Sequence, residues 1–415
     1  MRRARARWFL IAVAVVLNGL PWIRPLPRGA QFLPAIETPT PIPPAAPGPI
    51  FTEELINPGS PLRMSHVASI CELPDGRLAA VWYAGSREGA RDVAIYFAAQ
   101  ERGQPNYALS PQTPLSLAGQ QMGEGGLGGR GPSPFWTTPR AILTPEQAGR
   151  DLHRAVRKVG NPLLFSDAAG KLRLLYVTIN VGGWSGSSLN LTTSTDEGDS
   201  WAPSRRLTLS PFFNVSELVR NRPAPLSDGS WLVPIYHEFL GKFPELLWLS
   251  ETADGLSATK SRISGGRSII QPALAALSTN TALAFLRDCS PRKRISMART
   301  DDAGRTWSPP QPLDLPNPDS GLTALRLADG RVLLAFNDSA AGRGNLSLAV
   351  SNDEGRTWRR LATLAEEAGA EFSYPFLLRT RDGKIHLAYT WKRKGIKHVA
   401  FNSAWLNARQ SQPPQ

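Results

Sequence analysis

The chain has 415 residues, of which 41% are hydrophobic and 20% are charged, and this ordinary globular composition excludes collagen-like, coiled-coil and wholly disordered proteins. The formal net charge is +13, but six arginines lie within the first 28 residues, which leaves about +7 on the rest of the chain. This modest excess, without a dense run of Lys and Arg, suits an anionic ligand and disfavours nucleic acid. Two cysteines and the absence of zinc, P-loop and dinucleotide motifs lead us to expect no cofactor and no metal.

The N-terminus is expected to direct the protein out of the cytoplasm. Residues 1–24 join a basic cluster to an apolar run, which is the pattern of a secretory signal or a membrane anchor. The run covers about 15 residues where a comfortable span needs roughly 20, and no clear cleavage site follows it. We slightly favour an uncleaved anchor, which predicts a periplasmic protein held at the inner membrane; a cleaved signal predicts a secreted one. Residues 25–50 are Pro-rich and predict an extended linker, and residues 409–415 predict a disordered tail.

A turn followed by an apolar strand recurs through residues 51–408. Asp-Gly or a related pair precedes leucine, β-branched and aromatic residues, which indicates hairpins. The later copies are spaced by about 50 residues, and the six copies occupy residues 74–83, 167–177, 227–236, 278–287, 328–337 and 381–391. A period near 50 with several strands per unit is typical of a β-propeller. We therefore predict an all-β fold, a six-bladed β-propeller.

A second repeat, Ser-x-Asp-x-Gly-x-x-Trp or a close variant, lies between these turns at residues 194–201, 300–307 and 351–358. The Asp can bond the amides of a tight turn, the Gly permits positive φ, and the Trp can fold back onto the blade. This is the Asp-box, or BNR repeat, and its expected role is structural. Cys71 and Cys289 fall in blades one and four, too far apart for a disulfide, so we predict two free thiols.

An insertion, residues 103–160, follows the first repeat, and its end predicts a short helix. Thr144 is the expected N-cap, Pro145 the first helical residue, Gln147 the partner in a capping box, and Gly160 the residue beyond the C-terminus. We expect this helix to lie over one face of the propeller.

Asp-boxes on six blades resemble the sialidase (neuraminidase) superfamily, specifically bacterial BNR-repeat sialidase-like proteins. The resemblance covers about residues 51–408. It implies hydrolysis of a terminal sugar whose anomeric carbon carries a carboxylate. In this family arginines hold that carboxylate, a tyrosine is the nucleophile with a glutamate to help deprotonate it, and an aspartate is the acid/base.

The family motifs assign most of the candidate substrate-binding residues. Arg87 and Asp92, five residues apart in GSREGARD, match a substrate-binding arginine and the acid/base. Arg287 in ALAFLRDCS and Arg343 in GRGNLSLAV match two arginines of the carboxylate clamp. His66 stands where the family's first arginine opens the first blade. Either His66 or Arg222 is expected to complete the clamp.

The nucleophile position is matched by Tyr374 in EFSYPFLLRTRDG. Its partner is expected in a Glu-x-Gln motif, where this chain has Ile269-Ile270-Gln271. Gln271 is therefore a candidate substrate-binding residue, and the glutamate is absent at Ile269. The candidates to replace it are Glu238 and Glu371. Polar residues also open the other blades, where a ligand site or a turn would use them: Asn161, Asn221, Asp319 and Ser320.

We predict an exported exo-glycosidase of the sialidase type, with Asp92 as acid/base and Tyr374 as nucleophile. Its expected partner is an acidic glycan or glycoconjugate, with no nucleic acid and with membrane contact only through an uncleaved N-terminal segment. The first alternative is a carbohydrate-binding propeller that has lost catalysis, favoured by His66 and the missing glutamate. The second is a glycosidase or lyase acting on a uronate-type polysaccharide. The sequence does not define the oligomeric state.

Overall fold

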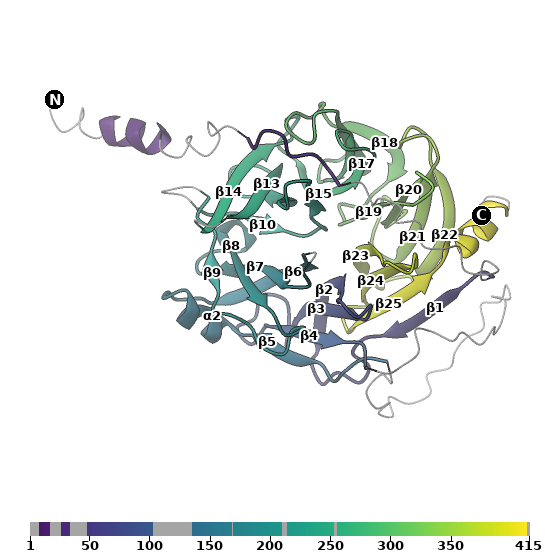
Figure 1. The fold of residues 1–415 in the computed structure, drawn as a ribbon, viewed down its shortest axis with the longest axis horizontal. Coiled ribbons are helices and arrows are strands. Elements are labelled where there is room, and N and C mark those ends of the chain that lie inside the picture. Colours follow the sequence, from purple (N-terminus) through teal and green to yellow (C-terminus); the bar gives the residue numbers. More distant parts are fainter. Residues whose placement is uncertain are drawn as a thin grey trace.

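The protein is described by a computed structural model that covers residues 8–16, 26–33, 48–102, 135–167, 169–209, 214–252 and 255–412. Six antiparallel sheets stand around a central axis, each with its first strand nearest that axis (Figure 1). This arrangement confirms the predicted all-β, six-bladed β-propeller.

The strands of each blade follow one another outward from the axis. Blades one and two contain β2 (Met64–Glu72), β3 (Leu78–Gly85), β4 (Ala94–Ala99) and β5 (Arg140–Leu143), then β6 (Lys158–Ser166), β7 (Leu172–Ile179), β8 (Ser187–Ser194) and β9 (Arg205–Arg206). Blades three and four contain β10 (Leu218–Val219) with β11 (Ala224–Pro225), β12 (Trp231–His237), β13 (Phe243–Thr252) and β14 (Gly255–Arg262), then β15 (Ile269–Ala276), β16 (Ala282–Asp288), β17 (Arg294–Thr300) and β18 (Gln311–Pro316). Blades five and six contain β19 (Thr323–Arg326), β20 (Val332–Phe336), β21 (Asn345–Ser351) and β22 (Arg359–Glu366), then β23 (Phe372–Arg379), β24 (Ile385–Trp391), β25 (Gly395–Phe401) and β1 (Phe51–Leu55).

The ring is closed because the first strand of the propeller completes its last blade. β1 pairs antiparallel with β25, with Phe51 opposite Phe401 and Leu55 opposite Lys397. The N-terminal strand is therefore the outermost strand of the last blade, so the first and last blades are held together by backbone hydrogen bonds.

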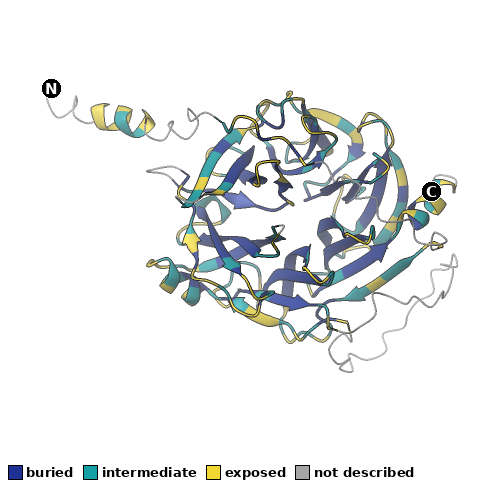
Figure 2. Ribbon diagram, in the orientation of Figure 1, coloured by how far each residue is buried: buried dark blue, intermediate teal, exposed yellow. Residues whose placement is uncertain are grey.

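The strands nearest the axis are buried almost throughout (Figure 2). Near their first residues four of them carry a bulge, with a shift of register and one residue at positive φ: Val67 (51°), Asn161 (44°), Gln271 (54°) and Tyr374 (53°). A bulge re-aims its side chain relative to the regular alternation of a strand. In each of these four blades, the bulge therefore changes the direction of one side chain at the same end of the axis.

The three Asp-boxes adopt one geometry. In each, the indole Nε1 of the Trp donates to the carbonyl of the box Gly at 3.0 Å, as from Trp201 to Gly198. The box Asp accepts hydrogen bonds from the backbone amide and the hydroxyl of the residue four positions on. The indoles are half-buried between neighbouring blades. The structural role predicted for this repeat is confirmed.

The segment after blade one differs in extent from the prediction. Its helix α2 (Pro145–Asp151) begins as expected, with the Thr144 hydroxyl accepting from the Gln147 amide at 3.2 Å. The helix ends at Asp151, and Gly160 lies within β6 because residues from Lys158 onward pair with β7. Part of the expected insertion is also β5, the outer strand of blade one. Residues 103–134 lie outside the described residues.

Parts of both ends of the chain have defined structure. Residues 8–16 are helical, and none of the helices in the described ranges is long and apolar enough to cross a membrane. Phe32 is fully buried between blades three and four, and Arg305 donates to the carbonyls of Pro27 and Ala30 at 2.9 Å, so this part of the predicted linker packs against the propeller. The predicted tail is partly wrong as well, because helix α3 (Ser403–Gln410) continues to Gln410.

Candidate active site

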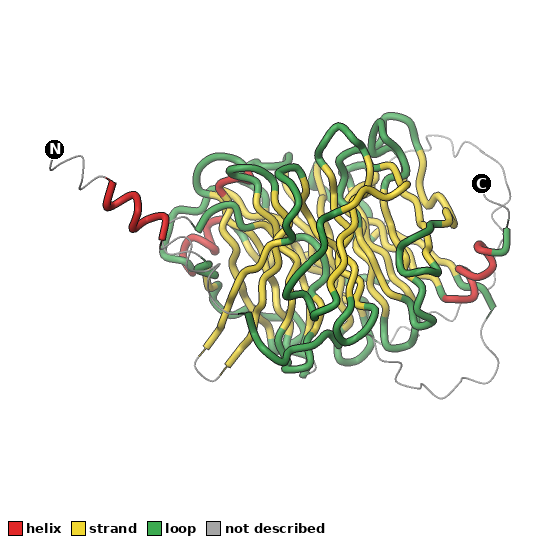
Figure 3. Tube along the Cα trace, turned by 90° about the horizontal axis from the view of Figure 1, so that it is seen from above, coloured by secondary structure: helices red, strands yellow, loops and turns green. Residues whose placement is uncertain are grey.

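The candidate site lies at the end of the axis where the inner strands begin. Loops lie at both ends of the strands (Figure 3). The loops that join the second and third strands of each blade emerge on the face where the inner strands begin, since each inner strand runs away from that face and the next strand returns. Polar side chains from the bulges and from these loops therefore gather at one mouth.

Arg287, in β16, is fixed by two partners at this mouth. Its Nε donates to Asp319 Oδ1 at 2.6 Å and its Nη1 donates to Gln271 Oε1 at 3.3 Å. The side chain is 11% exposed. Burial alone lowers the pKa of Arg287, but the nearby Tyr374 and the bond to Asp319 outweigh that effect and raise it. The guanidinium is thus a permanent charge whose orientation is set in advance.

Arg343, just before β21, also lies close to Tyr374. Its Nη2 donates to the Asp319 carbonyl at 3.0 Å and its Nη1 donates to Glu371 Oε1 at 3.3 Å. The guanidinium carbon is 5.6 Å from the centre of the Tyr374 ring. Arg287 and Arg343 therefore lie on the same mouth, as the motifs predicted.

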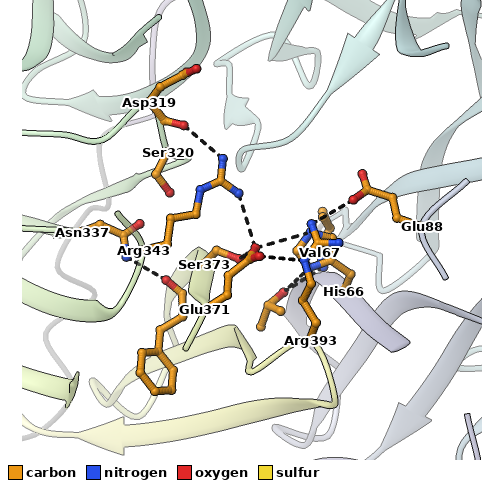
Figure 4. A network of polar contacts seen from close by, with 12 residues as sticks. His66, Val67, Glu88, Asp319, Ser320, Asn337, Arg343, Glu371, Ser373 and Arg393 are labelled. Atoms are coloured by element: carbon orange, nitrogen blue, oxygen red, sulfur yellow. Dashed lines mark hydrogen bonds and ion pairs between the residues drawn. The ribbon is translucent and has the colours of Figure 1, made fainter. Parts of the chain in front are cut away.

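Glu371 is the acidic centre of this network, between Arg343 and Arg393 (Figure 4). Arg393 Nε donates to Glu371 Oε2 at 2.7 Å, and the Ser373 hydroxyl donates to Oε1 at 2.6 Å. Burial raises the pKa of Glu371, but the Ser373 hydrogen bond, His66 and Arg393 lower it to about 2. Both carboxylate oxygens are thus engaged by Arg343, Ser373 and Arg393, so Glu371 positions arginines rather than replacing the missing base.

His66 is fully buried and neutral. Its Nδ1 lies 3.1 Å from Thr390 Oγ1, and its Nε2 lies 3.1 Å from Arg393 Nη2. Arg393 can only donate, so Nε2 is the acceptor and Nδ1 carries the proton. Burial and the Arg393 charge lower the pKa of His66 to about 3. His66 therefore supplies no cation to the clamp.

Arg393 places a guanidinium group next to His66, at the position where the family motif has an arginine and this chain has a histidine. It lies in the β24–β25 hairpin at φ 55°, and its Nη2 also donates to Glu88 Oε2 at 2.8 Å. Sequence reasoning missed Arg393 because the family motif directs attention to position 66. The one signal in the sequence was the cationic turn WKRKG directly after the apolar strand of the last repeat.

Arg220 is a second residue that the sequence reasoning missed. It is 2% exposed, its Nη2 donates to the Pro375 carbonyl at 2.7 Å, and its guanidinium carbon is 5.3 Å from the Tyr374 ring centre. Its Nε and Nη1 have no hydrogen-bond partner, and no carboxylate of the described residues pairs with it. Burial lowers the pKa of Arg220 to about 10, which leaves it charged at neutral pH. The only signal was its place beside Asn221 at the opening of blade three.

Gln271, and not Ile269, is the blade-four residue beside Tyr374. Ile269 is buried in the apolar cluster between blades three and four, so the expectation that position 269 faces the tyrosine is wrong. Gln271 Nε2 donates to Tyr236 Oη at 3.1 Å. A β-carbon added at Gly321 would lie 3.0 Å from Tyr374 Cδ1 and 3.1 Å from Gln271 Oε1, so both side chains pack around Gly321. The bulge at Gln271 explains the offset, since it turns that side chain to the axis.

Glu238, the other candidate base, lies in the β12–β13 loop. Burial raises its pKa, and the charges of Lys242 and Arg287 oppose that rise. Among the described residues no carboxylate accepts a hydrogen bond from Tyr374. Asn161 and Asn221 serve as supports: Asn161 donates to Tyr236 Oη at 3.1 Å, and Asn221 donates to the Gln271 carbonyl at 3.2 Å.

Arg87 and Asp92 lie in the β3–β4 loop at the rim of the same mouth, and both are exposed. Asp92 accepts from the Ser86 amide and hydroxyl, each at 2.9 Å, and the Ser86 hydroxyl bond is the main cause that lowers its pKa. Neither side chain bonds to the central network of described residues. The loop itself is tied to that network through Glu88, which pairs with Arg393.

Arg222 does not belong to this mouth. It lines a cavity with Cys71, Glu72 and Arg381, which lie at the far ends of the inner strands. Only Asn221 separates it from Arg220 in the sequence, but over that short distance the chain passes from one end of the axis toward the other. The expectation that Arg222 completes the clamp is therefore wrong.

The arrangement suits an organic anion next to a phenol. Four arginines lie around Tyr374 or its neighbours, namely Arg220, Arg287, Arg343 and Arg393, and all of them except Arg220 are partly exposed. Within the described ranges no group of three or more His, Cys, Asp and Glu side chains could hold a metal ion.

Comparison with known proteins agrees with the fold. The family described as BNR repeat-like domain matches residues 76–387. A Dyadobacter fermentans protein of unknown function is 13% identical with a TM-score of 0.63, over 86% of this chain and 100% of that one. The intramolecular trans-sialidase of Ruminococcus gnavus, solved with oseltamivir carboxylate, is 12% identical with a TM-score of 0.62, over 87% and 99%. The Trypanosoma rangeli sialidase, solved with 2,3-difluorosialic acid as a covalent intermediate, is 13% identical with a TM-score of 0.58, over 88% and 60%. No curated protein matches the chain significantly.

Proposed function

The chain belongs to the BNR repeat-like domain family, and from this membership and the site geometry we propose that it is a retaining exo-glycosidase that removes a terminal acidic sugar of the sialic acid type from glycoconjugates. The N-terminal segment supports an exported enzyme, periplasmic and anchored to the inner membrane, or secreted if that segment is cleaved.

The observation that carries the proposal is the position of Tyr374 between fixed arginines. Arg220 and Arg343 lie 5.3 and 5.6 Å from its ring centre, and Arg287 is fixed beside Gln271, which packs close to the same ring. A carboxylated sugar needs such a pair of guanidinium groups to set its orientation. A neutral nucleophile avoids the repulsion that a carboxylate nucleophile would meet beside the substrate's own carboxylate.

The proposed reaction assigns one role to each residue. The Tyr374 oxygen attacks the anomeric carbon as the bond to the leaving oxygen breaks; the phenolic proton passes to solvent water, and Asp92 gives its own proton to the leaving oxygen. Water then attacks the anomeric carbon and breaks the tyrosyl–sugar bond, Asp92 takes a proton from that water, the tyrosine oxygen regains its proton from solvent, and the configuration is retained. Arg287 and Arg343 hold the carboxylate, and Arg393 keeps Glu371 charged and in place.

Charge stabilisation, rather than a glutamate base, supports the nucleophile in this mechanism. Gln271 is neutral, so it cannot accept the phenolic proton. The buried Arg220 and the ion-paired Arg287 both interact electrostatically with Tyr374, and cations in a water-poor site stabilise developing negative charge strongly.

A second candidate function is carbohydrate binding without turnover. The specific observation in its favour is that Gln271 stands beside Tyr374 where the family chemistry uses a carboxylate. Such a protein would bind acidic sugars through Arg287 and Arg343 and release them unchanged.

A panel of fluorogenic glycosides separates these functions. The 4-methylumbelliferyl α-sialoside should be hydrolysed, and the matching β-glucuronide should not. Tyr374→Phe should abolish turnover and leave the affinity for the free sugar within a fewfold, whereas Arg287→Ala should weaken that affinity by about 1.5–3 kcal/mol. Binding without turnover by the wild type would establish the second candidate and contradict the first.

A further inference from the structure

The other end of the propeller axis holds a cavity of about 370 Å³ that the proposed reaction does not use. It opens among the far ends of the inner strands of blades one, two, three and six, and Arg222, Arg379 and Arg381 line it together with Glu72 and Asp167. A volume of this order is in the range of small-molecule sites.

Some of the charged side chains in this cavity have an ion-pair partner and others do not. Arg381 Nε donates to Glu72 Oε1 at 3.1 Å, and Asp167 Oδ2 accepts from Arg173 Nη1 at 2.6 Å, so both carboxylates already have a cationic partner. The side chains of Arg222 and Arg379 make no hydrogen bond and no ion pair with any described residue, although burial lowers the pKa of Arg222 and the nearby Glu72 charge acts on it and opposes that effect. Two guanidinium groups thus line one concave space without a directly bonded carboxylate.

Another part of the cavity wall is apolar and aromatic. Trp231 is 8% exposed and lines the cavity with Phe165, Leu164 and Ile70. Its ring is held by the Arg173 guanidinium, 4.4 Å from the ring centre, and by the edge of Phe165. A rigid aromatic wall beside cationic groups suits a ring-shaped ligand that carries one anionic substituent.

We propose that this cavity is a second binding site, for a sugar-sized organic anion bearing a carboxylate, sulfate or phosphate group. Arg222 and Arg379 hold the anionic group, and the Trp231 wall receives the ring. Arg222 is exposed at this surface, so a ligand can reach it from solvent. The site is independent of the proposed glycosidase activity, because none of its residues belongs to the Tyr374 mouth.

The test is calorimetric titration with glucuronate, glucose 6-sulfate and glucose 6-phosphate as probes, and with glucose as the neutral control. All titrations use the Arg287→Met background, which weakens anion binding at the Tyr374 mouth. We expect at least one anionic probe to bind and glucose not to bind. Adding Arg222→Met or Arg379→Met should weaken binding at least tenfold, and Arg222→Lys, which keeps the charge, should restore part of it. Arg356→Met, an exposed arginine on an Asp-box, is the matched control and should change nothing.

Two results would overturn the proposal. One is that no anionic probe binds at concentrations up to about 10 mM, which corresponds to less than about 3 kcal/mol of binding free energy. The other is binding that Arg222→Met and Arg379→Met leave unchanged while their thermal unfolding matches that of the background protein. If either methionine variant is misfolded, Arg222→Lys and Arg222→Gln provide the comparison at the same position.

Discussion

The guanidinium carbon of Arg220 lies 5.3 Å from the centre of the Tyr374 ring, and this arginine is almost completely buried with no carboxylate partner among the described residues. A buried charge that is neither paired nor fully hydrogen-bonded costs folding free energy. A function that uses this charge would explain why the fold tolerates it.

Arg220→Met should therefore separate stability from activity. Methionine fills a similar volume without the buried charge, so the free energy of unfolding should stay the same or rise by up to about 2 kcal/mol. Turnover of the α-sialoside should fall at least tenfold, because the developing charge on Tyr374 loses its stabilisation. Urea unfolding and steady-state kinetics measure the two effects. The control is Arg326→Met at the far end of β19, whose Nε is also buried without a partner; equal loss of activity in both variants would contradict the role of Arg220.

Gln271→Glu should raise turnover. The glutamate has nearly the same shape as the glutamine, can accept from Arg287 Nη1 as Gln271 Oε1 does at 3.3 Å, and adds a proton acceptor beside Tyr374. We expect kcat to increase at least tenfold. Ile269→Glu is the matched control: it buries a carboxylate in an apolar cluster, so it should cost several kcal/mol of stability and give no gain. A gain at position 269 and none at 271 would contradict this placement of the two residues.

His386 should make stability depend on pH. Its Nδ1 is 3.0 Å from His398 Nε2, and burial followed by the His398 charge lowers the pKa of His386 to about 3. The unfolded chain binds a proton at this position below pH ~6.5 and the folded chain does not. Stability from this residue is therefore present above pH ~6.5 and is lost as the pH falls toward 3.

Comparison with His386→Asn isolates that contribution. Titrating groups that do not contact residue 386 are common to both proteins and cancel. One of them is Glu217, whose pKa burial raises to about 7 and which acts with the opposite sign. Between pH 7 and pH 5 the wild type should lose about 2 kcal/mol more free energy of unfolding than the variant. Urea titrations at the two pH values measure this difference, and parallel pH dependence would refute it.

The Asp-box tryptophans should contribute moderately to stability. Trp307 is half-buried, and its Nε1 donates to the Gly304 carbonyl at 3.0 Å. Trp307→Ala should cost about 1–3 kcal/mol, less than for a fully buried ring. Trp307→Phe keeps most of the apolar contact and should cost about 1 kcal/mol for the hydrogen bond. Thermal unfolding that is unchanged in the alanine variant would show that the ring does not hold the blades together.

The blades were predictable because their signals are local and repeated. Asp-Gly turns and Asp-boxes specify hairpins within about ten residues of sequence, and their period gives the ring. The closing strand was not predictable in the same way. β1 is a short strand of mixed polarity, and its pairing partner, at Phe401, lies at the opposite end of the chain.

The site was predictable where a motif fixes both residue and position, as for Arg287, Arg343 and Tyr374. Site residues were missed where they contact residues of another blade that are distant in the sequence. Arg393 meets His66 across 327 positions, and no local pattern records that contact. The bulge at Gln271 and the crossing between Arg220 and Arg222 decide which end of the axis a side chain faces, and a shift of one or two residues reverses the result.

The most direct test of the proposed function is covalent trapping of Tyr374. Incubation with 2,3-difluorosialic acid, followed by intact-protein and peptide mass spectrometry, should show one added sugar per chain, located on the peptide that contains Tyr374 and absent from Tyr374→Phe. The absence of an adduct on the folded wild-type protein, or an adduct on another residue, would contradict the proposal that this propeller is a sialidase-type glycosidase with Tyr374 as its nucleophile.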